Sequence, residues 1–160
     1  MHHKILLNKP TYYSSKVRNV DFGTGVTLVE PCNLYECTIG DYTFIGPFVE
    51  IQKNVVIGAK CRIQSHSFIC SKVKIGDNCF VGHGVMFTND LFKSGKPSPR
   101  ESDWLSTVIG QNVSIGSNAT ILPTQIVDNT VIGAGAVVTK DILVPGIYAG
   151  NPAKLLRKLN

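Results

Sequence analysis

Charge, metal-ligand spacing and long apolar runs are all scarce in this chain of 160 residues. Only 17% of the residues are charged, and although the net charge is +5, the positive residues form no continuous run. The sequence therefore argues against nucleic-acid binding, and its one basic cluster, near the C-terminus, suits a small phosphorylated ligand equally well. No apolar stretch is long enough to span a membrane, and no signal peptide is visible. We expect one domain that contacts neither nucleic acid nor a membrane.

The five cysteines form no Cys-x-x-Cys pair and show no zinc-like spacing, so we expect no metal site. Three of them, Cys37, Cys61 and Cys79, recur at a position that small residues such as Val49 and Ser67 otherwise occupy. They are predicted to be small core residues. Reduced thiols in turn indicate a cytoplasmic protein.

What the chain has in abundance is a six-residue period. A large apolar residue recurs every six positions from Ile39 to Phe87, often followed by glycine, and the period resumes from Ile109 to Val138. This spacing fits neither a helix nor an amphipathic strand. It predicts an all-β solenoid, a three-sided prism in which three hexapeptides make one coil of about 18 residues.

The interruptions of the period divide the chain. Residues 1–20 are predicted to be an N-terminal cap segment, and 21–145 the prism, with a weak first coil in which Asn33 takes an aliphatic position. Residues 89–106, with two prolines and a glycine, are predicted to form a protruding loop, and loops of this length are usually functional. Within 146–160, Asn151-Pro152 followed by leucines and basic residues predicts a short C-terminal helix.

The repeat, the stretch Ile-Gly-Ala-Gly-Ala-Val-Val-Thr-Lys-Asp at 132–141 and the ending Ala-Gly-Asn-Pro-Ala-Lys at 149–154 closely resemble the left-handed β-helix acyltransferases. The resemblance covers about residues 21–158. It implies a left-handed parallel β-helix, acetyl-CoA as co-substrate, and a homotrimer with its acetyl-CoA sites between neighbouring prisms.

Three central segments, 44–52, 62–70 and 81–90, resemble a subgroup of N-acetyltransferases that act on nucleotide-linked 3-amino sugars. The implied substrate is a dTDP-3-amino-3,6-dideoxyhexose, with UDP-3-amino-uronates as substrates of a related branch. The implied products enter O-antigen or S-layer glycans. The residues alone do not decide between dTDP and UDP or give the stereochemistry of the sugar.

The loop begins Thr88-Asn89-Asp90, where antibiotic-modifying relatives often carry a histidine that acts as general base. The resemblance instead implies that Asn89 holds the sugar amine by a hydrogen bond. An amine needs a strong base less than a hydroxyl does, so the CoA sulfur can take the proton itself. The alternative for Asn89 is a turn residue that opens the loop.

Two histidines lie within the repeat. His83, one hexapeptide before Asn89, is the candidate base or acceptor contact, or else a wall histidine at the trimer interface. We expect His83 and Asn89 on adjacent faces of nearly the same coil. His66 is a candidate substrate contact, or else a corner residue.

Three further residues are candidates for substrate binding. Asn33, if interior, needs a hydrogen-bond partner or closes the end of the prism by stacking. Tyr35 is a candidate contact to a base or sugar across the interface. Arg100, at the end of the loop, is a candidate partner for a pyrophosphate, or else a solvated charge. Trp104 is expected to pack the loop back onto the wall.

For acetyl-CoA the resemblance implies three groups of residues. Backbone contacts come from Gly133, Ala134 and Gly135, and contacts to pantetheine and phosphates from Thr139 and Lys140. The adenosine end is assigned to Pro152, Lys154 and Arg157.

Two other readings stay open. One is an O-acetyltransferase of a sugar or antibiotic hydroxyl, which requires a histidine base. The other is a non-catalytic or metal-binding trimer, which requires histidines at metal spacing across an interface, and only His66 and His83 lie in the repeat.

Overall fold

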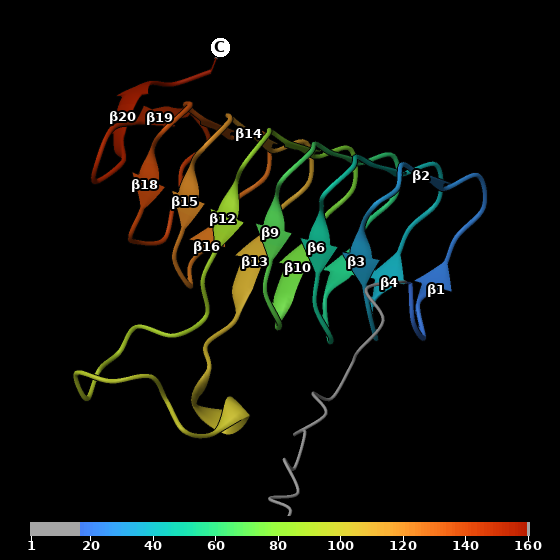
Figure 1. Cartoon of the computed structure of the whole chain (residues 1–160). Coiled ribbons are helices and arrows are strands. Elements are labelled where there is room, and N and C mark those ends of the chain that lie inside the picture. The colour runs from blue at the N-terminus through green and yellow to red at the C-terminus, as the bar shows by residue number, and fades with distance from the viewer. Residues whose placement is uncertain (1–16, 160) are drawn as a thin grey trace, which may run out of the picture.

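The computed structural model describes residues 17–159, which wind into a three-sided prism (Figure 1). Short strands from successive coils pair in parallel to build three sheets, and the predicted left-handed parallel β-helix is confirmed. The strands of face 1 are β1 (Asp21–Phe22), β4 (Thr38–Ile39), β7 (Val56–Ile57), β10 (Val73–Ile75), β13 (Thr107–Ile109) and β16 (Gln125–Ile126). The strands of face 2 are β2 (Thr27–Leu28), β5 (Phe44–Ile45), β8 (Arg62–Ile63), β11 (Phe80–Val81), β14 (Ser114–Ile115), β17 (Val131–Ile132), β19 (Ile147–Ala149) and β20 (Lys154–Arg157). The strands of face 3 are β3 (Asn33–Leu34), β6 (Glu50–Ile51), β9 (Phe68–Ile69), β12 (Met86–Phe87), β15 (Thr120–Ile121) and β18 (Val137–Val138).

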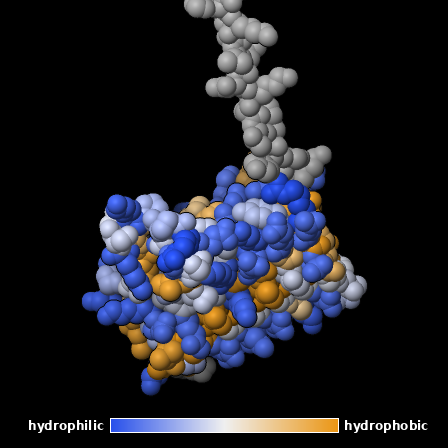
Figure 2. Space-filling model, turned by 90° about the horizontal axis from the view of Figure 1, so that it is seen from below, coloured by the Kyte–Doolittle hydropathy of each residue, from blue (hydrophilic) through white to orange (hydrophobic). Residues whose placement is uncertain are grey.

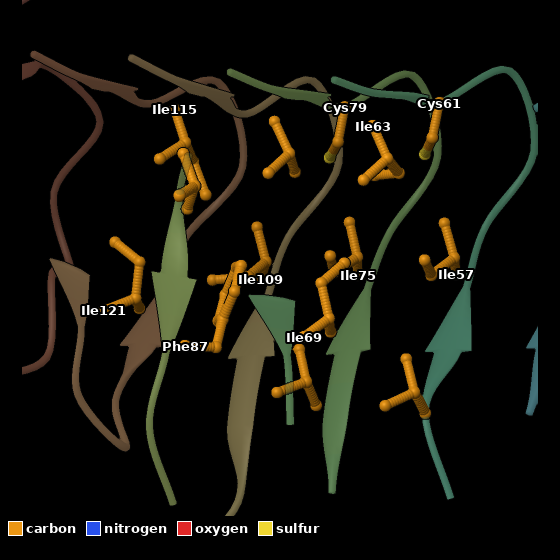
Figure 3. Packing of buried hydrophobic residues seen from close by; sticks show 14 of the residues in the cluster. Ile57, Cys61, Ile63, Ile69, Ile75, Cys79, Phe87, Ile109, Ile115 and Ile121 are labelled. Atoms are coloured by element: carbon orange, nitrogen blue, oxygen red, sulfur yellow. The ribbon is translucent and has the colours of Figure 1, made fainter. Parts of the chain in front are cut away.

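The six-residue period places a buried apolar side chain on each strand from β3 to β18. Ile57, Ile63 and Ile69, on three successive faces, are all buried and point into the interior (Figure 3). Each stacks on its counterpart in the next coil, about 4.8 Å away, which is the usual spacing between paired strands. Each buried isoleucine contributes about 1.5–3 kcal/mol by leaving water, so the stacked isoleucines inside the prism are the main source of stability.

The corners of the prism depend on residues that tolerate a left-handed backbone. The fourth position of the hexapeptide has a positive φ in most coils, and asparagines such as Asn54, Asn78 and Asn118 often occupy it. Gly58 is needed for a different reason, because a Cβ there would lie 2.7 Å from the carbonyl carbon of Gly76 in the next coil. The corner glycines therefore let the backbones of successive coils approach closely.

The first coil is one residue short of the period, which corrects the prediction that Asn33 takes an interior aliphatic position. Leu34 is the buried residue of β3, and Asn33 faces outward and pairs in register with Glu50. The error arose because Leu34 and Ile39 are only five residues apart, so the phase of the first coil is shifted by one. The Oδ1 of Asn33 is buried and has no hydrogen-bond partner among the described residues.

The predicted C-terminal helix is wrong. Residues 150–153 form a turn, and β20 returns antiparallel to β19 at the end of face 2. The backbone edge of β19 offers hydrogen bonds to a returning strand, whereas a helix of fewer than about 12 residues is marginal by itself.

Outside the prism, the described residues hold little besides the long loop. The chain leaves the prism after β12 and returns to it at β13. The loop between these strands contains one short 3-10 helix, η1 (Glu101–Asp103). No helix within residues 17–159 is long and apolar enough to cross a bilayer. Seen from below the view of Figure 1, the surface shows separate hydrophobic patches among hydrophilic ones (Figure 2). The predicted cap segment lies almost wholly outside the described residues.

Candidate functional site

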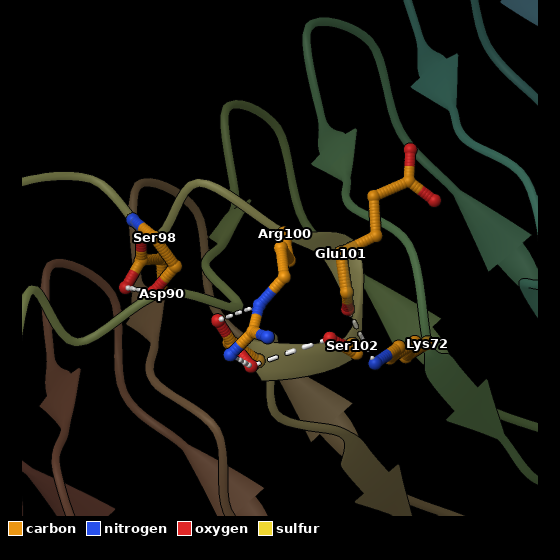
Figure 4. Close-up of polar contacts among 7 residues, drawn as sticks. Lys72, Asp90, Ser98, Arg100, Glu101 and Ser102 are labelled. Atoms are coloured by element: carbon orange, nitrogen blue, oxygen red, sulfur yellow. Dashed lines mark hydrogen bonds and ion pairs between the residues drawn. The ribbon is translucent and has the colours of Figure 1, made fainter.

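The first half of the loop is organised around Asp90. Its carboxylate accepts hydrogen bonds from the backbone N–H groups of Phe92 (2.9 Å) and Ser98 (2.6 Å) and from the Ser98 hydroxyl (3.0 Å). Asp90 and Ser98 lie together in Figure 4. The backbone hydrogen bonds from Ser98 and Phe92 lower the pKa of Asp90. This carboxylate therefore stays ionised and serves the loop itself.

The second half of the loop is held against the prism by two lysines from neighbouring coils. Lys72 Nζ donates to the carbonyl oxygens of Glu101 and Trp104, both at 2.8 Å, and Figure 4 shows Lys72 reaching toward η1. Lys53 Nζ lies 2.6 Å from Glu101 Oε1. These contacts place the loop along one corner of the prism, where the chain passes from face 3 to face 1; we name this corner the loop edge.

Asn89 lies at the loop edge and lines a mainly apolar cavity of about 330 Å³. The cavity, which we name the apolar cavity, is lined by Gln52, Phe68, Cys70, Phe87, Thr88, Asn89, Asp90, Phe92 and Trp104. The Asn89 side chain donates from Nδ2 to the Ser71 carbonyl oxygen at 3.3 Å. Burial raises the pKa of the Cys70 thiol to about 12, so this cysteine is not a nucleophile at neutral pH.

A second cavity continues along the loop edge toward the first coil. It measures about 370 Å³ and shares Gln52 and Trp104 with the apolar cavity. We name it the polar cavity; its lining is Arg18, Tyr35, Glu36, Gln52, Lys53, Ser71, Glu101 and Trp104. The Arg18 guanidinium lies 5.1 Å from the centroid of the Tyr35 ring. Burial and the nearby Glu50 carboxylate raise the pKa of Tyr35, so its hydroxyl stays protonated.

The apolar cavity and the polar cavity together form one groove along the loop edge. Arg100 lines neither of these two cavities. It contacts Asp103 through Nε at 3.3 Å and Nη2 at 3.4 Å, and its side chain is 75% exposed. Both residues line a separate cavity of about 380 Å³ that the loop forms with its own residues. The structure therefore brings Asn89 and Tyr35 to one groove and leaves Arg100 outside it.

The two histidines lie at another corner of the prism, where the chain passes from face 2 to face 3; we name it the histidine edge. His83 is exposed, and its Nδ1 lies 2.8 Å from Ser65 Oγ. His66 stacks on Phe48, with 4.8 Å between ring centroids. His83 follows β11 of face 2 and Asn89 follows β12 of face 3, so the two residues lie at neighbouring corners of one coil, at either end of face 3.

The residues assigned to coenzyme A also divide between the two edges. Gly133, Ala134 and Gly135 lie at the corner that carries the histidines, two coils further on. Thr139, Lys140, Pro152 and Lys154 line a cavity of about 370 Å³ at the C-terminal end. Arg157 pairs with Ile147 in the β19–β20 hairpin and does not line this cavity.

Sequence reasoning missed Lys53 and Lys72 as anchors of the loop. Both are ordinary wall residues in the repeat, and nothing in their local sequence indicates that a loop after residue 88 would reach them. Trp104, by contrast, was expected to pack the loop onto the wall, and it lines both cavities of the groove.

Within residues 17–159, no group of three or more His, Cys, Asp or Glu side chains is arranged to hold a metal ion.

Two family profiles match the repeat. The bacterial transferase hexapeptide (six repeats) matches residues 36–71, and the hexapeptide repeat of succinyl-transferase matches 72–86 and 106–140. Together they cover more than half of the chain, with the loop excluded.

Among curated relatives, the bifunctional protein GlmU of Streptococcus uberis is 30% identical over 138 residues, which are 84% of this chain. This chain spans about 30% of the length of that relative. The galactoside O-acetyltransferase of Escherichia coli is 33% identical over 135 residues, which are 77% of this chain and 64% of that protein.

Solved structures share the fold at lower identity. The N-acyltransferase AntD from Bacillus cereus, in complex with dTDP and coenzyme A, has a TM-score of 0.78 at 17% identity and covers 88% of this chain and 84% of its own. PerB from Caulobacter crescentus, in complex with CoA and GDP-perosamine, has a TM-score of 0.61 at 20% identity and covers 88% of this chain and 57% of its own.

Proposed function

Because the chain belongs to the bacterial hexapeptide-repeat transferase family, we propose that it is an acyltransferase that moves an acetyl group from acetyl-CoA to the amine of a nucleotide-linked sugar. The family match supports acyl transfer, and the galactoside O-acetyltransferase among its relatives is an acetyl transferase of sugars. Two proteins of the same fold bind coenzyme A together with dTDP or GDP-perosamine, which supports this pair of substrates.

The proposed acceptor is the 3-amino group of a dTDP-3-amino-3,6-dideoxyhexose. The observation that carries this choice is the apolar cavity beside Asn89, whose lining includes Phe68, Phe92 and Trp104. A 6-deoxy sugar brings a methyl group to such a lining. A UDP-3-amino-uronate would bring a carboxylate, which is costly to bury without a partner.

The proposed chemistry needs little from the protein besides position. The neutral amine attacks the thioester carbonyl carbon, the C–N bond forms, and the C–S bond breaks as the tetrahedral intermediate collapses. Asn89 holds the amine by a hydrogen bond. The nearby Asp90 is committed to Ser98 and Phe92, and Cys70 stays protonated. The amine proton therefore passes to the departing CoA sulfur, which leaves as the thiol.

The proposed active form is a homotrimer. Within one chain, His83 and the corner that holds Gly133–Gly135 are separated by face 3 from Asn89 and Thr139. Placing the histidine edge of one prism beside the loop edge of its neighbour reunites these residues in one cleft. His83 then faces the acceptor with its Nε2, while Ser65 occupies its Nδ1. Acetyl-CoA would extend from the C-terminal cavity, at Thr139, Lys140 and Lys154, toward Asn89.

We place the enzyme in the cytoplasm, where nucleotide sugars are made, and its product in O-antigen or S-layer glycan assembly.

The test of the proposed function is release of free CoA thiol from acetyl-CoA with purified protein. A dTDP-3-amino-3,6-dideoxyhexose is compared with its 4-epimer, with a UDP-3-amino-uronate and with a simple galactoside. The proposal expects turnover with at least one of the two dTDP-amino sugars and little with the others. Absence of thiol release with every 3-amino nucleotide sugar would refute it.

The galactoside O-acetyltransferase relative favours a second candidate, O-acetylation of a sugar hydroxyl. That reaction requires a general base, and His83 is the exposed histidine with one ring nitrogen already hydrogen-bonded. The O-acetyltransferase candidate predicts thiol release with the galactoside, loss of activity in His83→Ala, and little change of activity in Asn89→Ala. The N-acetyl proposal predicts that Asn89→Ala is the more damaging of the two.

A further inference from the structure

The polar cavity contains a balanced set of charges. Its lining has two cations, Arg18 and Lys53, and two carboxylates, Glu36 and Glu101. Three of these residues belong to the first two coils, whereas Glu101 comes from the loop, in η1. Among these lining residues the prism thus contributes an excess of one positive charge, and the loop carboxylate neutralises it.

Glu101 holds its place in two separable ways. Its backbone carbonyl accepts from Lys72 Nζ at 2.8 Å, and its carboxylate lies 2.6 Å from Lys53 Nζ. The side chains of Lys53 and Glu101 are 31% and 57% exposed. Exposed ion pairs contribute little to stability, so an anion of higher charge can replace this carboxylate while Lys72 still anchors the loop.

Aromatic groups stand beside these charges. Tyr35 and Trp104 both line the polar cavity, and Trp104 also lines the apolar cavity. Aromatic side chains are suited to stacking a nucleobase, because every base offers a flat π-face. Gln52 lies between the two cavities, where its Oε1 accepts from the Ser71 N–H at 3.2 Å.

We propose that the polar cavity binds the nucleoside diphosphate of the acceptor, and that the diphosphate replaces the Glu101 carboxylate on Lys53. This inference rests on the proposed function, since it fixes where the carrier of the amino sugar lies. The two cavities adjoin at Gln52 and Trp104, so a sugar linked to that diphosphate enters the apolar cavity and presents its amine to Asn89. Glu101 acts as a stand-in for the phosphate when the groove is empty, and Arg100 takes no part.

The experiment measures binding of dTDP to the full-length protein by isothermal titration calorimetry, without acetyl-CoA. Lys53→Met removes the cation and is expected to raise the Kd about tenfold or more, the worth of one charge-assisted hydrogen bond. Glu101→Gln removes the competing carboxylate and leaves the backbone anchor to Lys72 intact. It is expected to lower the Kd about two- to fivefold, because dTDP no longer has to displace an ion pair.

Lys74→Met is the matched control. Lys74 is an exposed lysine on face 1, outside the groove, and its loss changes the net charge of the protein as Lys53→Met does. Its Kd for dTDP is expected to stay within twofold of the unmodified protein. Thymidine, which lacks the diphosphate, is expected to bind more weakly and with equal affinity to all variants.

Three results would overturn the inference: dTDP fails to bind, Glu101→Gln fails to tighten binding, or Lys53→Met behaves like Lys74→Met. The proposed function fails separately. If dTDP binding depends on Lys53 and Glu101 but no dTDP-amino sugar is acetylated, only the reaction is wrong. If a dTDP-amino sugar is acetylated with the same KM in all three variants, only the position of the diphosphate is wrong.

Discussion

Replacing Asn89 by alanine separates a catalytic role from a structural one. The side chain makes one hydrogen bond within the described residues, from Nδ2 to the Ser71 carbonyl oxygen at 3.3 Å. The backbone carbonyl of Asn89 accepts from the Leu105 N–H at 2.8 Å, and alanine keeps that contact. The substitution therefore removes one side-chain hydrogen bond and leaves the closure of the loop in place.

The two roles predict different magnitudes. One neutral hydrogen bond contributes about 1 kcal/mol, so the melting temperature should fall by only about 2–4 °C. A hydrogen bond that positions the attacking amine should contribute about 1.5–3 kcal/mol in the transition state. Its loss lowers kcat/KM about 10- to 150-fold, since each 1.36 kcal/mol changes a rate tenfold.

The assay is thiol release from acetyl-CoA with the best dTDP-amino sugar, alongside thermal unfolding of the same preparations. Gln125→Ala removes an exposed amide from face 1 and serves as the control, with both quantities expected to stay near those of the unmodified protein. The reasoning is refuted if Asn89→Ala keeps kcat/KM within threefold of the unmodified value. A large loss of thermal stability with little loss of activity would make Asn89 a turn residue.

Three further predictions concern the prism and its loop. Phe87→Ala should lower the free energy of unfolding by about 3–5 kcal/mol in urea titrations, because Phe87 is fully buried in β12, whereas the outward-facing Phe80→Ala should cost far less. Lys72→Met removes two hydrogen bonds to the loop and should speed its cleavage by trypsin with little change in melting temperature; an unchanged cleavage rate would contradict the anchoring role. The pKa of Asp90 is lower in the folded protein than the ordinary aspartate pKa of about 4. The Asp90 carboxylate therefore stabilises the loop fully above about pH 4, and this stabilisation is lost as pH falls through the lowered pKa of the folded state. Fluorescence of Trp104, the single tryptophan, should report this acid transition, and Asp90→Asn should abolish it.

The repeat could be predicted from the sequence because the interior of the prism accepts one kind of residue at fixed intervals. Ile39 through Phe87 hold one phase, and every one of these positions is buried. The same reasoning failed at Asn33, where a coil one residue short moved Leu34 into the core. It failed again at the C-terminus, where the local pattern of Pro152 and leucines favoured a helix but the free edge of β19 attracted a strand.

The candidate site was predicted in part. Asn89, Tyr35, Thr139 and Lys140 were identified as residues, but not the groove and the separate C-terminal cavity that they line. The loop was located by its prolines and its break in the period, while its anchors Lys53 and Lys72 were not found. A loop that folds back across earlier coils leaves no periodic trace in the sequence it contacts.

The prism, the side chains that fill it and the point where the loop leaves it could all be predicted from the amino-acid pattern, because a period of six encodes which residues face inward. Which outward-facing residues contact one another became clear only from the folded chain. Stacking of coils brings residues about 18 positions apart into contact, so that Lys53, Lys72 and Glu101 gather at one edge of the prism. The same winding sets His83 and Asn89, six residues apart, on opposite sides of face 3, because one hexapeptide spans one full face.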